Sequence, residues 1–262
     1  GLGAFVSAMV LTTTRAKASV AVGISAQDSF HIASVYLNRV SQRGPAYDAP
    51  KWLTDVHIAR LQHAAAEASV TRDTTPISRD SVNAVLREAS GSYLESMLAA
   101  DSFVVSRWRT SDEPIRVWVQ PYSPAAGFSP DFVSPTRRGF TAWNDLMLGV
   151  HFEIVDDSTA ADVHVTWTSV MSRRDRVGVA YRVTSSGGWI VLAHVMLSTA
   201  RDIYTVQNAA RHEAGHVLGL GHSPNMEDIM AGATEGRQYK ITDADARTVT
   251  LLYRLPAGQL PR

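Results

Sequence analysis

The stretch RHEAGHVLGLGHS, residues 211–223, constrains this chain more than any other segment. It places three of the 9 histidines, His212, His216 and His222, in one short run. Residues four apart share one face of a helix, so His212 and His216 can contact a single metal ion. Gly219 stands where such a helix would end, and glycine adopts the left-handed conformation there at little cost. The spacing therefore predicts a helix, a bend and a third imidazole that returns to the first two.

The ligand chemistry indicates a catalytic zinc site. The chain has no cysteine, so a metal site must use His, Asp, Glu or water. Three neutral imidazoles that leave one coordination position open are typical of catalytic zinc, whereas structural zinc sites are closed. Glu213 is too close to the first histidine to ligate comfortably, but it can reach a water on the metal. We predict one Zn²⁺ bound by His212, His216 and His222, with Glu213 as the general base.

The full run H-E-x-x-H-x-x-G-x-x-H resembles the long zinc signature of the metzincin metallopeptidases. Ser223, directly after the third histidine, is similar to the matrixin branch, which contains the matrix metalloproteinases. Met230 in EDIMAG lies eight residues after His222, which is the matrixin spacing for the methionine of the Met-turn. The resemblance covers roughly residues 103–255 and implies that Met230 packs beneath the histidines without ligating the metal.

The resemblance implies an α+β fold. Its metzincin-like catalytic domain would contain a twisted, mostly parallel sheet, an active-site helix and a C-terminal helix, preceded by a helical N-terminal region. The implied activity is that of a zinc endopeptidase, which hydrolyses peptide bonds of extended protein substrates through a zinc-activated water with Glu213 as base. The alternative is a catalytically silent protein of the same fold that binds zinc or peptides. The presence of Glu213 favours the enzyme.

The chain departs from the matrixin pattern at the sites of further metal ions. Matrixins usually hold a structural zinc and calcium, but only His194 of the additional histidines remains, and Tyr181 stands where another is expected. An ordinary hydrogen-bonded strand histidine is the favoured interpretation of His194. Asp162 is a weak remnant of the calcium ligands. We therefore expect one catalytic zinc and do not expect a structural zinc or calcium.

Hydrophobic periodicity separates a helical N-terminal part from an α+β part. Helical spacing predicts helices over residues 28–42, 52–70 and 81–100, the last with a cap at Ser78 or Asp80. Period-two alternation predicts the later strands. These lie in PIRVWVQPY, VHFEIVD, ADVHVTWTS and RVGVAYRVTSSGGWIVLAHVMLS. The later helices are predicted in FSPDFVSPTRRGFTAWNDLM, entered through Ser134-Pro135, in DIYTVQNAARHEAGHVLGL, and in ITDADARTVTLLYRL, capped at Thr242 or Asp243.

Two segments are candidates for contact with a substrate. WIVLAHVML is a candidate edge strand that could pair with an extended peptide, although an interior strand is nearly as well supported. Residues after Met230, roughly Ala231–Lys240, would wall a side-chain pocket behind the zinc helix. Asn208, one helical turn before His212, is a further candidate for the lining of that pocket.

The N-terminal third suggests export and a pro-like region. GLGAFVSAMVL followed by AKA resembles the core and cleavage site of a signal peptide, and the alternative is a flexible or packed N-terminal segment. We predict residues 1–26 as a signal remnant and linker, 27–102 as a helical pro-like region and 103–262 as the catalytic domain. The enzyme would then be secreted, extracellular or periplasmic. Asp101 or Asp73 could block the zinc in a zymogen, or the region could shield the catalytic domain without touching the metal.

Composition limits the classes of partner. Lys plus Arg and Asp plus Glu both total 25, which leaves no net charge and gives no reason to expect nucleic acid as a partner. No apolar run is long enough for a stable membrane span. We expect a monomer whose partner is a protein or peptide substrate.

Overall fold

The computed structural model describes most of the chain after the first 77 residues. The predicted signal remnant, the helices expected over 28–42 and 52–70, Asp73 and most of the proposed pocket segment lie outside the described residues. The described ranges are 78–110, 113–171, 176–184, 187–232 and 240–261.

A five-stranded sheet forms the centre of the fold, with the strand order β3-β2-β4-β6-β5. Strands β2, β3, β4 and β6 run parallel, and β5 runs antiparallel beside β6. This arrangement confirms the α+β fold with a mostly parallel sheet. The strands are β2 (Ile115–Val119), β3 (Phe152–Val155), β4 (Val163–Thr168), β5 (Gly178–Thr184) and β6 (Ile190–Ser198).

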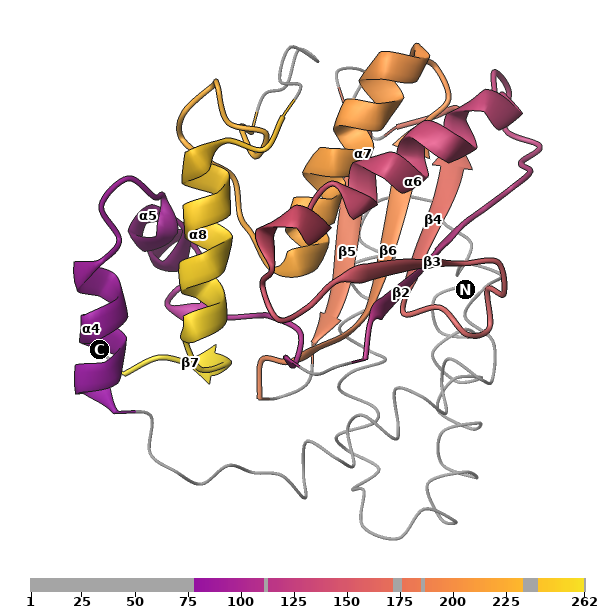
Figure 1. The fold of residues 1–262 in the computed structure, drawn as a ribbon. Coiled ribbons are helices and arrows are strands. Elements are labelled where there is room, and N and C mark those ends of the chain that lie inside the picture. Colours follow the sequence, from indigo (N-terminus) through magenta and orange to yellow (C-terminus); the bar gives the residue numbers. More distant parts are fainter. Residues whose placement is uncertain (1–77, 111–112, 172–175, 185–186, 233–239, 262) are drawn as a thin grey trace, which may run out of the picture.

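Two helices, α6 (Val133–Thr141) and α7 (Ile203–Leu218), lie side by side over one face of this sheet (Figure 1). Side chains alternate between the faces of a strand, so every second residue of β2, β4 and β6 can join a single core. Val117, Val165 and Val195 are fully buried in the same cluster as apolar residues of α7. The apolar residues that alternate along these strands therefore form the face of the sheet that α7 covers.

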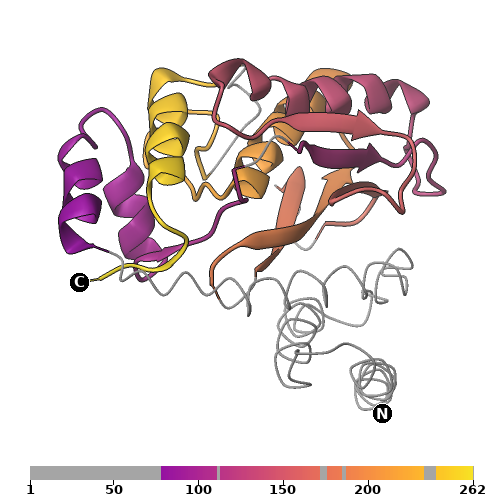
Figure 2. The same ribbon diagram turned by 60° about the horizontal axis from the view of Figure 1, so that its bottom comes forward.

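A second group of helices lies beside the sheet rather than on it. Helices α4 (Arg79–Arg87), α5 (Leu94–Ala100) and α8 (Asp243–Arg254) are grouped at one side of the molecule, which Figure 2 shows from below. The short strands β1 (Val104–Val105) and β7 (Gly258–Gln259) pair antiparallel next to them. The remaining short elements are the 3-10 helices η1 (Pro130–Phe132) and η2 (Asn144–Leu146).

Three local predictions need correction. The single helix expected over 81–100 is two helices, because Gly91 adopts a left-handed conformation (φ 76°) between α4 and α5. The helix expected to start at Ser134-Pro135 begins earlier, where Ser129 caps η1 and η1 leads directly into α6. WIVLAHVML is an interior strand and not an edge strand, because β6 lies between β4 and β5. The two edge strands of the sheet are β3 and β5.

The structure identifies the N-cap residues of α4 and α8, for each of which the sequence offered two candidates. The side chain of Ser78 accepts a hydrogen bond from the backbone N–H of Ser81 and caps α4. Thr242 caps α8 in a capping box with Asp245, because each side chain accepts from the backbone N–H of the other residue. None of the helices in the described part of the chain has the length and apolarity to cross a membrane.

Candidate metal centre

Helix α7 carries the histidine motif and has a defined start and end. Asp202 caps its N-terminus by accepting hydrogen bonds from the N–H groups of Tyr204 and Thr205. Gly219 ends it in the left-handed conformation with φ 112°. A Cβ atom at Gly219 would overlap the backbone carbonyl oxygen of Ser106, so this turn excludes any larger residue. The helix therefore stops at one fixed residue, and the chain returns toward its own last turns.

This return brings the three histidines together. One ligand atom from each of His212, His216 and His222 lies within 4.8 Å of the other two. Among the described residues, these three side chains are the ones that lie close enough together to bind one metal ion. The Nε2 atoms of His216 and His222 are 3.2 Å apart. Zn–N bonds of about 2.0–2.1 Å at a tetrahedral angle place two ligand nitrogens about 3.3 Å apart. The separation of the two imidazoles therefore fits two ligands of one zinc ion.

Hydrogen bonds to backbone carbonyls orient two of the rings. His212 donates from Nδ1 to the carbonyl oxygen of Ile229 at 2.6 Å, and His216 donates from Nδ1 to that of Leu220 at 2.9 Å. These bonds fix the tautomer, so each Nε2 carries a lone pair. Two lone pairs that face each other at close range repel unless a cation lies between them. The donor set thus matches a cation that accepts nitrogen ligands.

Burial keeps these imidazoles neutral. Removal from water lowers the pKa of His212 to about 4 and the pKa of His216 well below its usual value. The pKa of His222 is also lowered, first by partial burial and then by the positive charge of Arg176. Neutral rings at neutral pH are the form that binds a metal.

Glu213 lies on the same helix and is buried beside the histidines. Burial raises the pKa of its carboxyl group to about 8, against the opposing effects of Arg176 and the backbone N–H of Ala180. Among the described residues, Oε2 of Glu213 has no hydrogen-bond partner. Native proteins rarely leave a buried carboxylate oxygen without a partner, so this oxygen is available to a water or a substrate group.

Met230 packs against the helix that carries the motif. It is fully buried, and a Cβ atom at Gly215 would overlap its Sδ atom. Met230 therefore packs against the helix backbone one residue before His216. Thioether sulfur is soft and adapts to irregular spaces, which suits a floor beneath three rings.

Side chains from distant parts of the chain satisfy the last carbonyl groups of α7. Trp108 Nε1 donates to the carbonyl oxygen of Val217, Tyr253 Oη to that of Leu218, and Arg182 Nη1 to that of His216. The last carbonyls of a helix lack partners within the helix, and a cation is stabilising at that end. These contacts hold the helix end, and with it the bend, in place.

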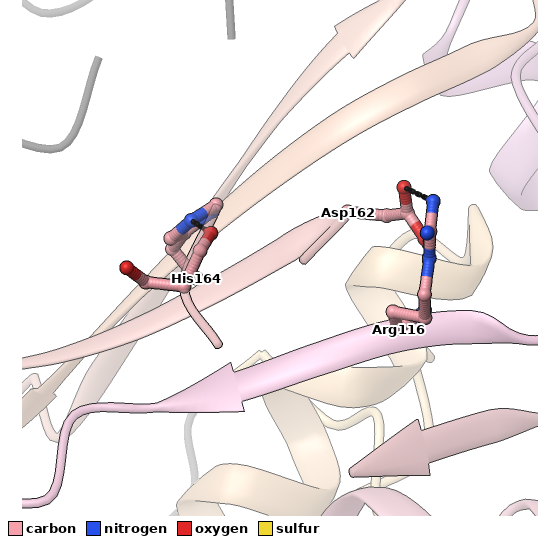
Figure 3. Close-up of polar contacts among 4 residues, drawn as sticks. Arg116, Asp162 and His164 are labelled. Atoms are coloured by element: carbon pink, nitrogen blue, oxygen red, sulfur yellow. Dashed lines mark hydrogen bonds and ion pairs between the residues drawn. The ribbon is translucent and has the colours of Figure 1, made fainter. Parts of the chain in front are cut away.

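The residues considered for further metal ions have other partners. Arg116 donates from its backbone N–H and Nε to Oδ2 of Asp162 and from Nη2 to Oδ1, so both carboxylate oxygens are engaged (Figure 3). His194 on β6 hydrogen-bonds through Nε2 with Oγ1 of Thr166 at 2.8 Å. Tyr181 pairs with His194 in register and stacks on its ring. Asp162 and His194 thus each have a protein partner, and the expectation of a single metal ion stays a prediction.

The structure also describes two other candidate residues, Asn208 and Asp101. Asn208 is buried on α7, and its Nδ2 atom has no hydrogen-bond partner among the described residues. Asp101 follows α5 with an exposed side chain and does not belong to the group of possible ligands found in the described part of the chain.

The comparisons agree with the motif. The family model described as matrixin matches residues 107–254, which is more than half of the chain. The chain belongs to the matrixin family. Matrixin membership supports a zinc metallopeptidase with peptide substrates, and matrixins are generally extracellular. No curated protein matches the sequence. The expected resemblance is therefore confirmed at the level of the family.

Sequence reasoning missed several residues around this matrixin site. Asp245 is fully buried and accepts hydrogen bonds from the backbone N–H groups of Ile229 and Met230. The sequence feature that could have identified Asp245 is its position three residues after Thr242, which is the spacing of a capping box. His164 is also fully buried, and it lies opposite His194 in the register of β4 and β6. No local pattern distinguishes His164 from an exposed strand histidine.

Proposed function

We propose that this matrixin is a zinc endopeptidase that hydrolyses peptide bonds. The observation that supports the proposal is the convergence of His212, His216 and His222, with the buried carboxylate of Glu213 on the same helix. The three imidazoles would hold the ion, and Met230 would pack below them without ligation. A zinc ion bound there polarises the substrate carbonyl and lowers the pKa of water from 15.7 to about 7.

Glu213 performs the proton transfers in this proposal. Its partnerless Oε2 accepts a proton from the attacking water, and the carboxyl group then returns that proton to the amine of the leaving peptide. The buried position of Glu213, one residue after His212 on α7, suits a group that takes a proton from water and gives it to the leaving amine. The alternative of a silent zinc-binding protein gives no role to this buried acid.

An extended substrate would bind along β5. This strand is an edge of the sheet, so one row of its backbone groups is not used by another strand in the described sheet. Its first residue, Gly178, contacts Glu213, so a peptide paired with β5 would pass the proton-transfer group. Helix α7 and β5 pack against each other, so this edge lies next to the helix that carries His212 and His216.

Export of the protein and latency of the enzyme are two further parts of the proposal. Because matrixins are generally extracellular, we propose that this one is secreted, and residues 1–26 stay a predicted signal remnant. The pro-like role of residues 27–102 also stays a prediction. Activity measured on the whole chain before and after limited proteolysis would test latency, since equal activity would exclude it.

The test of the proposed function uses Glu213→Ala in the full chain. We expect zinc content to stay near one ion per chain while cleavage of casein falls by at least about 10²-fold. Glu153→Ala, an exposed acid on β3, is the matched control and should cleave like the unmodified protein. Unchanged cleavage by Glu213→Ala would remove Glu213 from the mechanism. A zinc-loaded, unmodified protein with no peptidase activity would favour the silent alternative.

A further inference from the structure

Helices α4 and α5 precede the segment matched by the matrixin model, yet they share its core. Leu94, Met97 and Leu98 of α5 are at most 4% exposed and belong to the same buried cluster as the residues under α7. The backbone N–H of Tyr93 donates to Oγ1 of Thr248 in α8 at 3.1 Å, and this bond is buried. The pair of helices is thus packed into the catalytic domain and is not merely placed beside it.

We propose that Tyr93 and Met97 are positioning residues for the metal centre, so that the functional unit includes α5 and its N-cap rather than beginning near residue 103. This inference rests on the proposed zinc site. Two separate series of contacts carry it, one from each residue, and they end at different histidines.

The first series runs from Tyr93 to His212. Tyr93 donates from its hydroxyl group to Oδ1 of Asp245 at 3.1 Å, in a buried hydrogen bond. The Asp245 carboxylate accepts from the N–H groups of Ile229 and Met230 at 3.0 and 3.3 Å. The carbonyl oxygen of Ile229 accepts the Nδ1 proton of His212. The hydroxyl of Tyr93 therefore helps to hold the carboxylate that fixes the peptide to which a candidate ligand is bonded.

The second series runs from Met97 to the loop that carries His222. The backbone N–H of Gly221 points at Sδ of Met97, 3.0 Å away. A Cβ atom at Gly221 would lie 2.9 Å from Cγ of Met97, so the side chain and the loop backbone are in close contact. Leu220, the preceding residue, supplies the carbonyl oxygen that orients His216. Met97 therefore supports the bend from which the third imidazole is delivered.

The Asp245 carboxylate also accepts from the backbone N–H of Thr242, so Tyr93 is one of several donors to it. Asp245 is fully buried, so loss of the Tyr93 hydroxyl removes one donor from a carboxylate that has no access to bulk water. Groups that orient metal ligands through hydrogen bonds typically change metal affinity 10–100-fold when they are removed. Because Tyr93 acts through two further groups, we expect an effect at the lower end of that range.

The experiment uses the full chain and measures zinc binding directly. Tyr93→Phe removes only the hydroxyl group, and Met97→Ala removes the contact with Gly221. The readouts are the zinc dissociation constant, from competition with a chromogenic chelator, and the visible spectrum of the Co²⁺-substituted protein, which reports ligand geometry. We expect about 10-fold weaker zinc binding for each variant and an altered cobalt spectrum.

A matched control separates positioning from stability. Val82 of α4 is buried in the same cluster but contributes no atom to either series of contacts, so Val82→Ala creates a cavity without removing any of them. It should lower the unfolding midpoint without a change in the cobalt spectrum. Met97→Leu, which restores the bulk, should recover part of the affinity that Met97→Ala loses.

The two proposals fail in different ways. Wild-type affinity and spectrum in both Tyr93→Phe and Met97→Ala would overturn the positioning roles, whatever the peptidase activity is. A cobalt spectrum that changes equally in Val82→Ala would also overturn them, because the effect would then be one of stability. Weakened zinc binding in a protein that cleaves no peptide would support the positioning roles while contradicting the proposed peptidase function.

Discussion

Gly178 of β5 and Glu213 of α7 lie in direct contact. A Cβ atom at Gly178 would be 2.6 Å from Oε1 and 2.8 Å from Cγ of Glu213. The absence of a side chain at one end of the edge strand therefore makes the space that the buried carboxyl group occupies. This relationship leads to a prediction about catalysis.

Gly178→Ala should lower activity without removing the metal. The added methyl group forces the Glu213 carboxylate or β5 to move, and a displacement of about 1 Å at a catalytic group can cost about 10²-fold in rate. We expect kcat to fall by about 10–100-fold with one zinc still bound, measured by peptide cleavage and metal analysis. Val179→Ala, next along the strand with its side chain on the other face, is the control. Equal kcat values for Gly178→Ala and the unmodified protein would contradict the contact.

Gly219→Ala should destabilise the protein through the bend in the histidine motif. A left-handed conformation costs an alanine about 1–3 kcal/mol, and the methyl group would also overlap the carbonyl oxygen of Ser106. Gly91 also lies in the left-handed region (φ 76°, against 112° for Gly219), but a Cβ atom at Gly91 would have its nearest neighbour, Cδ of Arg247, 3.8 Å away. Urea unfolding should therefore show a larger loss of stability for Gly219→Ala. If Gly219→Ala lowered the free energy of unfolding no more than Gly91→Ala, the expected overlap of the methyl group with the Ser106 carbonyl oxygen would be contradicted.

His194 should make the fold sensitive to acid. Burial lowers its pKa to about 3 in the folded protein, with a smaller contribution from His164. The unfolded chain binds the proton near pH 6.5 and the folded protein does not, so stability falls as the pH drops from 6.5 toward 3. Between pH 7.5 and 5 the loss is about 2 kcal/mol.

The variant His194→Gln tests this prediction. It keeps a polar side chain that can bond to Thr166 and cannot be protonated, so its unfolding free energy should depend less on pH. The comparison is the change in urea unfolding free energy from pH 7.5 to 5 in both proteins. Because both keep the three histidines of α7 and its bend, the acid sensitivity of the metal centre cancels. Identical changes in the two proteins would show that His194 is not the group responsible.

The Arg116–Asp162 pair should contribute a modest, salt-sensitive free energy. The pair is bidentate, with side chains 35% and 18% exposed, so solvent screens part of the attraction. A double-mutant cycle with Arg116→Ala and Asp162→Ala should give a coupling of about 1 kcal/mol that decreases in 1 M salt. Addition of calcium should leave the unfolding midpoint unchanged, because both oxygens of Asp162 already accept hydrogen bonds. A rise in the midpoint with calcium would contradict this assignment.

Patterns between near neighbours determined much of this protein from its sequence alone. The spacing of His212, His216, Gly219 and His222 encodes a helix, a left-handed stop and a return, because each step depends on backbone geometry within a few residues. Period-two alternation likewise identified the strands, and the zinc signature identified the matrixin family.

The tertiary structure decided the order of the strands and the contacts between distant segments. Alternation shows that WIVLAHVML is a strand, but only the pairing of β6 on both sides shows that it is interior and that β5, beside it, is an edge strand. Tyr93 meets Asp245 across 152 residues of sequence, and no local pattern encodes such a contact. Propensity and capping act over one or two turns, whereas these relations depend on which apolar faces pack together when the whole core forms. The sequence thus predicted the candidate ligands, and the packing of the folded chain decided which residues hold them in place.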